Sequence, residues 1–320
     1  MRRAGLALLA LLAAIPAADG RRAVAPTISA RPVALDPADP ARRQVGALRY
    51  LEGWVLTSND RRFGGISSIF QQDGRFTALS DDGMLFRFRL GARGQIGEVR
   101  FRPLPAVPGA RGVKGDRDSE SMQHDPASGR TWVGFEQHNQ IWRYAPRFDH
   151  AEAHAAPAAM ADWPGNGGPE AMVRLKDGRF IVFSEEAEGP GETREALLFP
   201  GDPSTAGARP VRFFYRPPEG YVPTDAAQLP DGRLVVLNRH FTIMDGVSAT
   251  VTIADPRDIK ADSVMAGREV ARLGSPLTVD NMEALSLAQE GGRTILWIAS
   301  DDNKSPIQRT LLLKFALEER

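Results

Sequence analysis

The chain of 320 residues contains no cysteine. This absence excludes a disulfide framework, a zinc site built on thiolates and catalysis by a thiol. No sign of charge dominates either, because 40 Lys and Arg residues balance 40 Asp and Glu residues. A neutral chain of this kind lacks the basic surface that nucleic acids and anionic membranes attract, so we expect no nucleic-acid partner.

Several catalytic motifs are also missing. The five histidines show neither HxH nor HExxH spacing, which leaves a zinc-hydrolase site of that type unsupported. The chain has no GxSxG segment, so it lacks the nucleophile elbow of an α/β-hydrolase. It also has no RHGxRxP segment, which argues against a histidine acid phosphatase.

Hydrophobic runs are short everywhere, including the one near the start of the chain. Arg2 and Arg3 precede an apolar segment at residues 6–15, and small residues follow up to Gly20. This pattern predicts a secretory signal peptide over residues 1–20, with a twin-arginine signal as the alternative. The apolar segment is shorter than the ~20 residues that cross a bilayer. We therefore expect a periplasmic or secreted protein without stable membrane insertion, and a monomer.

A strand-rich unit recurs five times along the rest of the chain. Each copy has an acidic or small residue, an apolar run, a Gly-Arg turn and a strand that ends in polar residues. The copies begin at Ser67, Glu120, Glu170, Asp225 and Glu283, so they are 53, 50, 55 and 58 residues apart. Strand-rich repeats with a period near 50 predict a β-propeller.

Four strands can be assigned to every unit except the last, which has three before the chain ends. Residues 46–56 (GALRYLEGWVL) are expected to supply the missing strand and so to close the ring. The sequence thus predicts an all-β propeller with five blades over residues 46–320, preceded by a linker or extended strap over residues 21–45. A six-bladed ring with one degenerate blade is the alternative.

The repeat also predicts where a functional site lies. In a four-stranded blade the innermost strand lines the channel, and the loop leading into it shares a face with the loop leaving the second strand. The first positions are Ser67, Glu120, Glu170, Asp225 and Glu283. The second positions are Asp81, Asp82, Glu136, Glu185, Glu186, Asn238, Asp301 and Asp302. We therefore expect two rings of oxygen donors at one mouth of the channel.

Carboxylates gathered around a narrow opening repel one another unless a cation neutralises them. Hard oxygen ligands suit Ca²⁺ or Mg²⁺, and we favour Ca²⁺ in an exported protein. The predicted metal ligands are Glu120, Glu170, Asp225 and Glu283. Two alternatives remain open. Basic residues such as Arg239, Lys304 and Arg309 could balance the rings, or each acid could simply cap a turn.

Two further features belong to opposite faces. His240 follows Arg239 on the predicted functional face, where it is either a solvated loop residue or a catalytic or phosphate-binding group. The DGR turns at Asp73, Asp177 and Asp231 are expected on the other face, as tight hairpin turns in which glycine supplies a positive φ.

The last repeat is the most specific part of the chain. Residues 280–315 (DNMEALSLAQEGGRTILWIASDDNKSPIQRTLLLKF) resemble the closing segment of the bacterial "esterase-like activity of phytase" family. GPEAMVRLKDGRFIVFSEE, LPDGRLVVLNRHF and FGGISSI resemble its earlier blades, so the resemblance covers residues 46–320. It implies an exported propeller, related in architecture to calcium-dependent phytases, that hydrolyses a small-molecule ester or phosphoester. One departure is Asn238, because the family usually has Glu before this Arg.

Three functions remain open from the sequence. The first is a metal-dependent ester or phosphoester hydrolase. In it Ca²⁺ activates water, Asp81, Glu185, Asp301 or His240 transfers protons, and Arg239, Lys304 and Arg309 hold the anionic part of the substrate. The second is a non-catalytic binding propeller of the cell envelope with structural calcium. The third is an enzyme similar to sugar lactonases.

Overall fold

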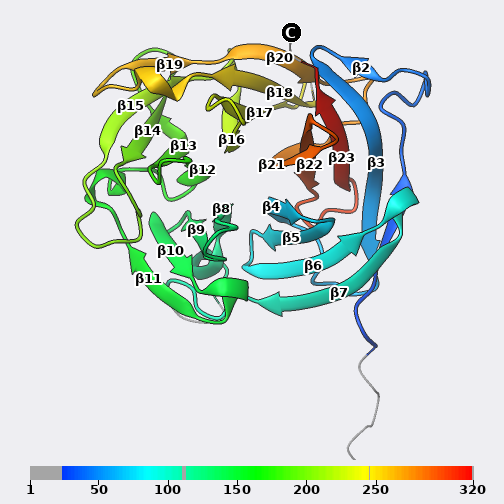
Figure 1. The fold of residues 1–320 in the computed structure, drawn as a ribbon, viewed down its shortest axis with the longest axis horizontal. Helices are drawn as coiled ribbons and strands as arrows, with labels where there is room; N and C mark the ends of the chain where they lie inside the picture. The colour runs from blue at the N-terminus through cyan, green and yellow to red at the C-terminus, as the bar shows by residue number, and fades with distance from the viewer. Residues whose placement is uncertain (1–23, 110–112, 245, 319–320) are drawn as a thin grey trace, which may run out of the picture.

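The computed structural model describes residues 24–109, 113–244 and 246–318. Its strands form five sheets arranged around a central channel (Figure 1), and all pairs are antiparallel except the short pair of β15 (Val211–Arg216) and β19 (Val264–Ala266). This is the five-bladed β-propeller that the repeat predicts, and the alternative with six blades is wrong. Within the described ranges, no helix has the length and apolar character needed to cross a membrane.

Each blade contributes its strands in order from the channel outward. Blade one contains β4 (Ile66–Gln72), β5 (Arg75–Ser80), β6 (Met84–Leu90) and β7 (Ile96–Pro103). Blade two contains β8 (Ser119–His124), β9 (Thr131–Phe135), β10 (Gln140–Tyr144) and β11 (Ala151–Ala155). Blade three contains β12 (Pro169–Arg174), β13 (Phe180–Glu188), β14 (Arg194–Phe199) and β15 (Val211–Arg216). Blade four contains β16 (Val222–Gln228), β17 (Leu234–Thr242), β18 (Gly246–Ala254) and β20 (Arg268–Leu273). Blade five contains β21 (Asn281–Glu290), β22 (Arg293–Asp301), β23 (Thr310–Leu317) and β3 (Leu48–Ser58).

The two ends of the propeller sequence meet in blade five. Strand β3 pairs antiparallel with β23, in a register that runs from Thr310 opposite Leu56 to Leu317 opposite Leu48. The predicted closure of the ring by an N-terminal strand is therefore confirmed. This pairing joins the two ends of the ring and supplies the outer strand of blade five, so β23 is not left with an open edge.

Three short strands lie outside the four-strand pattern. Strands β1 (Ile28–Pro32) and β2 (Gln44–Val45) both pair with β3, within the region that the sequence marks only as a linker or strap. Strand β19 (Val264–Ala266) belongs to the connection between β18 and β20, but it pairs in parallel with β15 of blade three. These additions cover outer edges of blades three and five.

The hydrophobic core is divided into five layers, one between each pair of neighbouring blades. Between blades three and four, for example, Phe183 and Tyr215 pack with Val236. Between blades five and one, Trp297 stacks on Trp54 with ring centroids 6.2 Å apart. Because both faces of most blades are covered in this way, the strands carry long apolar runs with only short polar interruptions.

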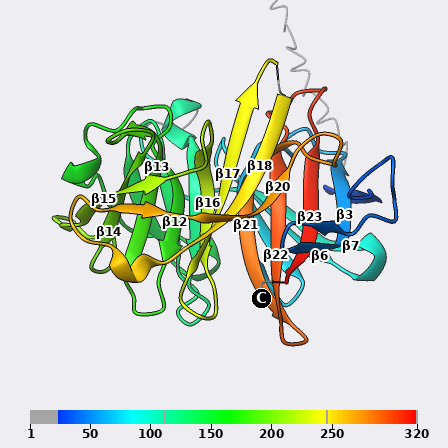
Figure 2. The same cartoon turned by 90° about the horizontal axis from the view of Figure 1, so that it is seen from above.

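The two ends of the channel differ. At one end the hairpin of β17 and β18 projects beyond the blades (Figure 2). At the other end lie the DGR turns, where Gly74, Gly178 and Gly232 have φ values of 75°, 90° and 97°. Only glycine adopts such angles without steric cost, which explains the repeated glycine of the motif.

Candidate functional site

A β-bulge opens every innermost strand. The register shifts between Ile66 and Ser68 in blade one, and the other four blades shift at the corresponding place. The unpaired residues are Ser67, Glu120, Glu170, Thr224 and Glu283. A bulge can redirect a side chain, and here the bulged residues of four blades line one cavity.

Blade four departs from the predicted alignment by one residue. Its bulge lies at Thr224, so Asp225 does not join the other three carboxylates, contrary to expectation. The Asp225 carboxylate instead accepts hydrogen bonds from the amides of Ala226 (2.8 Å) and Leu285 (2.7 Å). It lines a separate cavity of about 570 Å³ toward the end of the channel with the DGR turns. Asp225 is thus a structural group that ties blade four to blade five.

The cavity lined by the bulged residues has a volume of about 690 Å³ and lies at the end of the channel with the projecting hairpin. Its acidic residues are Asp81, Asp118, Glu120, Glu136, Glu170, Glu185, Asp280, Glu283 and Asp301. Only two cationic residues of the described chain line it, Lys114 and Arg239. The lining therefore has a large excess of carboxyl groups, which is the electrostatic setting of a cation site.

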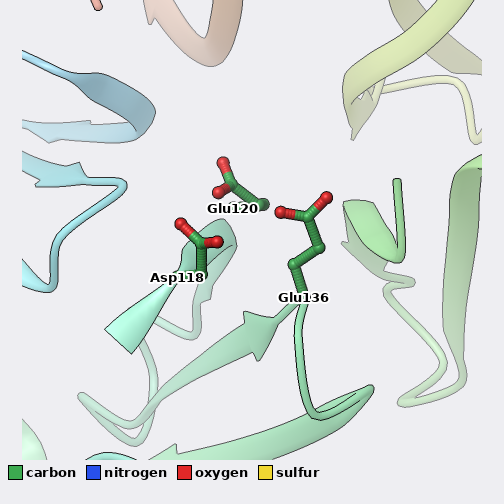
Figure 3. A group of neighbouring side chains, drawn as sticks. All are labelled: Asp118, Glu120 and Glu136. Carbon is green, nitrogen blue, oxygen red and sulfur yellow. The ribbon is translucent and has the colours of Figure 1, made fainter. Parts of the chain in front are cut away.

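Three of these carboxylates form a compact group in blade two. Asp118, Glu120 and Glu136 each have an oxygen within 4.8 Å of the other two, and Figure 3 shows the three side chains gathered around one space. Asp118 links a short 3-10 turn, η2 (Gly115–Arg117), to β8, and Glu136 directly follows β9. A 2.9 Å hydrogen bond from the amide of Glu136 to the carbonyl of Asp118 joins the two segments.

Burial and mutual repulsion hold protons on this group. Burial, aided by the neighbouring carboxylates of Asp118, Glu185 and Glu186, raises the pKa of Glu136 to about 7, although a hydrogen bond from the amide of Gly167 opposes the shift. Burial also raises the pKa of Glu120 well above its ordinary value, with Glu136 adding to the effect. A divalent cation would displace such protons, because it stabilises the ionised form of each carboxylate.

Arg239 neutralises a different part of the lining. Its Nη2 lies 2.5 Å from Glu185 Oε1, and its Nε lies 3.0 Å from Glu283 Oε1. Because these residues belong to β13, β17 and β21, the ion pairs join blades three, four and five. Burial raises the pKa of Glu283 to about 8, although the Arg239 guanidinium opposes the shift. Arg239 itself is held fully charged by the same carboxylates.

Asp81 and Asp301 belong neither to the carboxylate group of blade two nor to the ion pairs of Arg239, and they are candidates for proton transfer. Asp81 Oδ2 lies 3.1 Å from Lys114 Nζ, whereas its Oδ1 is buried without a hydrogen-bond partner in the described chain. Burial, aided by the negative charges of Asp81 and Asp302, raises the pKa of Asp301 to about 7. The 2.6 Å hydrogen bond from the amide of Asn303 to Asp301 opposes that shift.

Three residues expected at the site lie outside the cavity lining. Lys304 Nζ binds Asp82 at 2.6 Å, and His240 Nδ1 lies 2.6 Å from the carbonyl of Gly220. Arg309 Nε donates to Asp280 at 3.1 Å, so it fixes a lining carboxylate without reaching the cavity itself. By contrast, the structure brings together Asp81, Glu120, Glu170, Glu185, Arg239, Glu283 and Asp301 as expected.

Three charged lining residues were not predicted from the sequence. Asp118 lies two residues before the bulged Glu120, and Asp280 lies three residues before the bulged Glu283. Both acids belong to loops that lead into innermost strands, so their position relative to the repeat could have identified them as lining residues. Lys114 lies in a segment that matches no repeat. The Asn238 side chain is fully buried, and its Oδ1 accepts a 2.9 Å hydrogen bond from Tyr215. Because Asn238 and Arg239 alternate along β17, the departure at Asn238 removes no group from the cavity lining.

The rim of the cavity adds apolar surface. Phe241 of β17 and Ile307, from the loop between β22 and β23, both line the cavity, with 59% and 89% of their surface exposed. The site therefore combines a carboxylate floor with an apolar rim.

Fold and site together define a five-bladed propeller with an acidic cavity at one mouth of its channel. The family described as "Phytase-like: Esterase-like activity of phytase" matches residues 61–304, and the chain belongs to this family. A comparison with curated protein sequences finds no match.

Similar solved structures include two other proteins. A luciferin-regenerating enzyme is 12% identical with a TM-score of 0.45, and the match covers 91% of this chain and 95% of that one. Regucalcin from Agrobacterium tumefaciens, a calcium-binding protein, is 15% identical with a TM-score of 0.43, and the match covers 92% and 93%.

Proposed function

We propose that this protein is an exported, metal-dependent hydrolase of a small-molecule ester or phosphoester, with its active site in the acidic cavity. The observation that carries the proposal is the imbalance of charge in the lining, where nine carboxyl groups face two cations. Both cations already have partners, since Arg239 pairs with Glu185 and Glu283 and Lys114 pairs with Asp81. The group of Asp118, Glu120 and Glu136 is left without a basic neighbour at ion-pair distance in the described chain.

These three residues fit a divalent cation. They offer hard oxygen ligands from separate segments at mutual distances within 4.8 Å. Glu170 lies next to them, and its pKa is raised by burial first and by Glu185 and Glu120 after that. Ca²⁺ suits such a flexible, all-oxygen donor set better than a metal that prefers nitrogen or sulfur.

The remaining residues have separate roles. A bound divalent cation would polarise the carbonyl or phosphoryl oxygen of the substrate. Asp301, with a pKa of about 7, accepts the proton of the attacking water, and its position across the cavity from blade two suits that role. Lys114 attracts an anionic group, whereas Phe241 and Ile307 contact an apolar one.

Location and assembly are part of the same proposal. Residues 1–20 carry the pattern of a secretory signal, which supports a periplasmic or secreted site of action, and they lie outside the described residues. The protein acts as a monomer, a proposal supported by the closure of the five-bladed ring within a single chain through β3 and β23.

Assays of the mature protein test the proposal. Hydrolysis of p-nitrophenyl esters and p-nitrophenyl phosphate is measured after chelation and again with added Ca²⁺ or Mg²⁺. We expect turnover that depends on the metal and is lost in Glu120→Gln. A rise in melting temperature with Ca²⁺ but no turnover would favour a non-catalytic binding propeller, and turnover of gluconolactone alone would favour a lactonase.

A further inference from the structure

A second cavity, of about 750 Å³, lies between blades one and two, and its lining has the opposite charge. Four arginines contribute to it: Arg75, Arg87, Arg100 and Arg147. Phenylalanine rings form much of the rest: Phe70, Phe76, Phe88 and Phe148. The lining includes Asp73 of a DGR turn, which places this arginine groove toward the end of the molecule away from the acidic cavity.

Strand pairing brings the arginines together. Arg87 of β6 lies directly opposite Arg100 of β7 in the antiparallel register of blade one. Arg147 comes from blade two, within the short 3-10 turn η3 (Pro146–Phe148). Two like charges directly opposite one another in a sheet destabilise it, so the arrangement needs a compensating interaction.

The carboxylates of the described chain do not neutralise all the arginines of the groove. Of the two acids in the lining, Glu98 lies 3.1 Å from Arg75 and 3.8 Å from Arg89, which is outside the groove. The other acid, Asp73, makes no ion pair with any residue that the structure describes. Among the described residues, no carboxylate lies at ion-pair distance from Arg87, Arg100 or Arg147. The groove thus holds unneutralised cations on both of the blades that form it.

Buried donors point to the same conclusion. Arg87 Nε is buried and has no hydrogen-bond partner within the described chain, and Arg102 beside it has two such nitrogens, Nε and Nη2. Burial lowers the pKa of Arg87, and the positive charges of Arg102 and Arg147 lower it further, with only Asp149 opposing them. A buried guanidinium nitrogen without an acceptor is costly, and an anion bound to the accessible part of the Arg87 guanidinium would offset the unfavourable charge there.

Apolar surface lies beside the charges. The Arg87 guanidinium is 5.6 Å from the ring centroid of Phe148, and Phe76 and Phe148 are almost completely buried. The Phe148 ring fixes the position of the guanidinium, whereas the partly exposed Phe70 gives the groove apolar surface that a ligand can reach. A ligand that matches both features has a multiply charged oxyanion at one end and an apolar group at the other.

We propose that the arginine groove binds an organic phosphate or phosphonate, with its oxyanion on Arg87, Arg100 and Arg147 and its apolar part against Phe70. Guanidinium groups suit this ligand because each can donate two parallel hydrogen bonds to a tetrahedral oxyanion. The phosphate could belong to a soluble metabolite or to a lipid headgroup. This site is separate from the acidic cavity and does not depend on hydrolysis there.

Calorimetric titration of the mature protein with phenylphosphonate tests the proposal. The carbon–phosphorus bond resists hydrolysis, and a chelator in the buffer prevents a metal from bridging the ligand to the acidic cavity. We expect binding that weakens with added salt and is at least tenfold tighter than that of inorganic phosphate. Benzyl alcohol, which has no charge, should bind much more weakly still.

Variants at the rim of the groove identify the site. Arg100→Gln and Arg147→Gln change exposed residues, so the fold should persist. Each should weaken phenylphosphonate binding about tenfold, as expected for loss of a charged hydrogen bond. Arg257→Gln removes an exposed arginine outside the groove and should leave binding unchanged.

Absence of phenylphosphonate binding at millimolar concentration, or undiminished binding by the double variant Arg100→Gln/Arg147→Gln, would overturn the proposal. Vesicles of phosphatidylglycerol distinguish the ligand sources. Vesicle binding that the double variant loses would support a lipid headgroup, whereas binding of phenylphosphonate without vesicle binding would support a soluble ligand.

Discussion

At the scale of single residues, Arg239 shows how one side chain organises this site. It extends from β17 and is mostly buried, with Glu185 and Glu283 on either side. A buried charge of this kind is tolerated only with close partners, and each partner in turn depends on it. The same residue therefore joins three blades and sets the charge of one wall of the acidic cavity.

Replacement of Arg239 by Met should destabilise the protein by about 3–5 kcal/mol, because it leaves two buried carboxylates unpaired. Urea unfolding at pH 8 measures the loss. The loss should shrink at pH 5, where Glu283, with a pKa of about 8, is protonated in the folded protein. Arg257→Gln, on the exposed surface, serves as control, and equal stability of Arg239→Met and the native protein at pH 8 would contradict this account.

Asp301→Asn should lower kcat about 10²–10⁴-fold with little change in KM, because it removes a general base but keeps the shape of the side chain. In the native protein kcat should rise as the pH increases through about 7, where the carboxyl group loses its proton. Steady-state kinetics from pH 5 to 9 check both effects. A profile of the same shape in Asp301→Asn would assign the base to another residue.

At the scale of elements, the β-bulges and the β17–β18 hairpin shape the site more than the regular strands do. The bulges place one residue per blade near the channel mouth, whereas the hairpin extends the wall beyond the blades. Phe241 faces the cavity from this hairpin, but Met244 at its tip does not line it. The hairpin thus provides a matched pair of exposed apolar residues.

Phe241→Ser should raise KM for aryl or long-chain acyl substrates about three- to tenfold, and should leave KM for a short aliphatic ester nearly unchanged. The expected loss corresponds to part of the contact of one aromatic side chain, on the order of 1 kcal/mol. Met244→Ser is the control, since that side chain is 91% exposed and outside the cavity lining. Equal effects of the two substitutions would exclude a specific role for the cavity rim.

At the scale of the whole molecule, the propeller is a ring in which five blades bring their acids to one opening. The raised pKa values of Glu136, Glu283 and Asp301 are a consequence of that convergence. Repulsion between these acids acts on several blades at once, and the blades are held together by the hydrophobic layers at their boundaries. We therefore expect the charge of the acidic cavity to affect the stability of the entire ring.

The metal-free protein should lose stability as the pH rises from about 5 to 8. Glu283 and Asp301 have folded-state pKa values of about 8 and 7, above their ordinary values, so the folded state keeps protons that the unfolded state releases. Melting in the presence of a chelator should show a decrease of several degrees over this range.

Addition of Ca²⁺ at pH 8 should restore the melting temperature by binding the folded state, and Glu120→Gln should reduce the restoration. Glu269→Gln, an exposed acid paired with Arg272, is the control. Stability that rises with pH under chelation, or an equal response to Ca²⁺ in Glu120→Gln, would contradict a metal site among these carboxylates.

Much of the fold follows from local patterns in the sequence. The repeated apolar runs predict the strands, the Gly-Arg turns predict the hairpins, and the incomplete last repeat predicts that residues 46–56 close the ring. The candidate site follows in part, because residues at the same place in each repeat reach the same end of the channel. Residues between repeats, such as Lys114, carry no periodic signal and could not be placed in advance.

By itself, the sequence favoured five blades and predicted the ring closure and most of the acids near one channel mouth, since each depends on a period that is visible along the chain. Only the tertiary structure decided which of these acids lie together in one cavity. A bulge shifts side chains by one residue, which places Thr224 rather than Asp225 with the glutamates. The structure also showed that Arg239 neutralises Glu185 and Glu283, and that Arg87, Arg100 and Arg147 converge between two blades. Register and long-range pairing arise from packing between blades, so no local pattern encodes them.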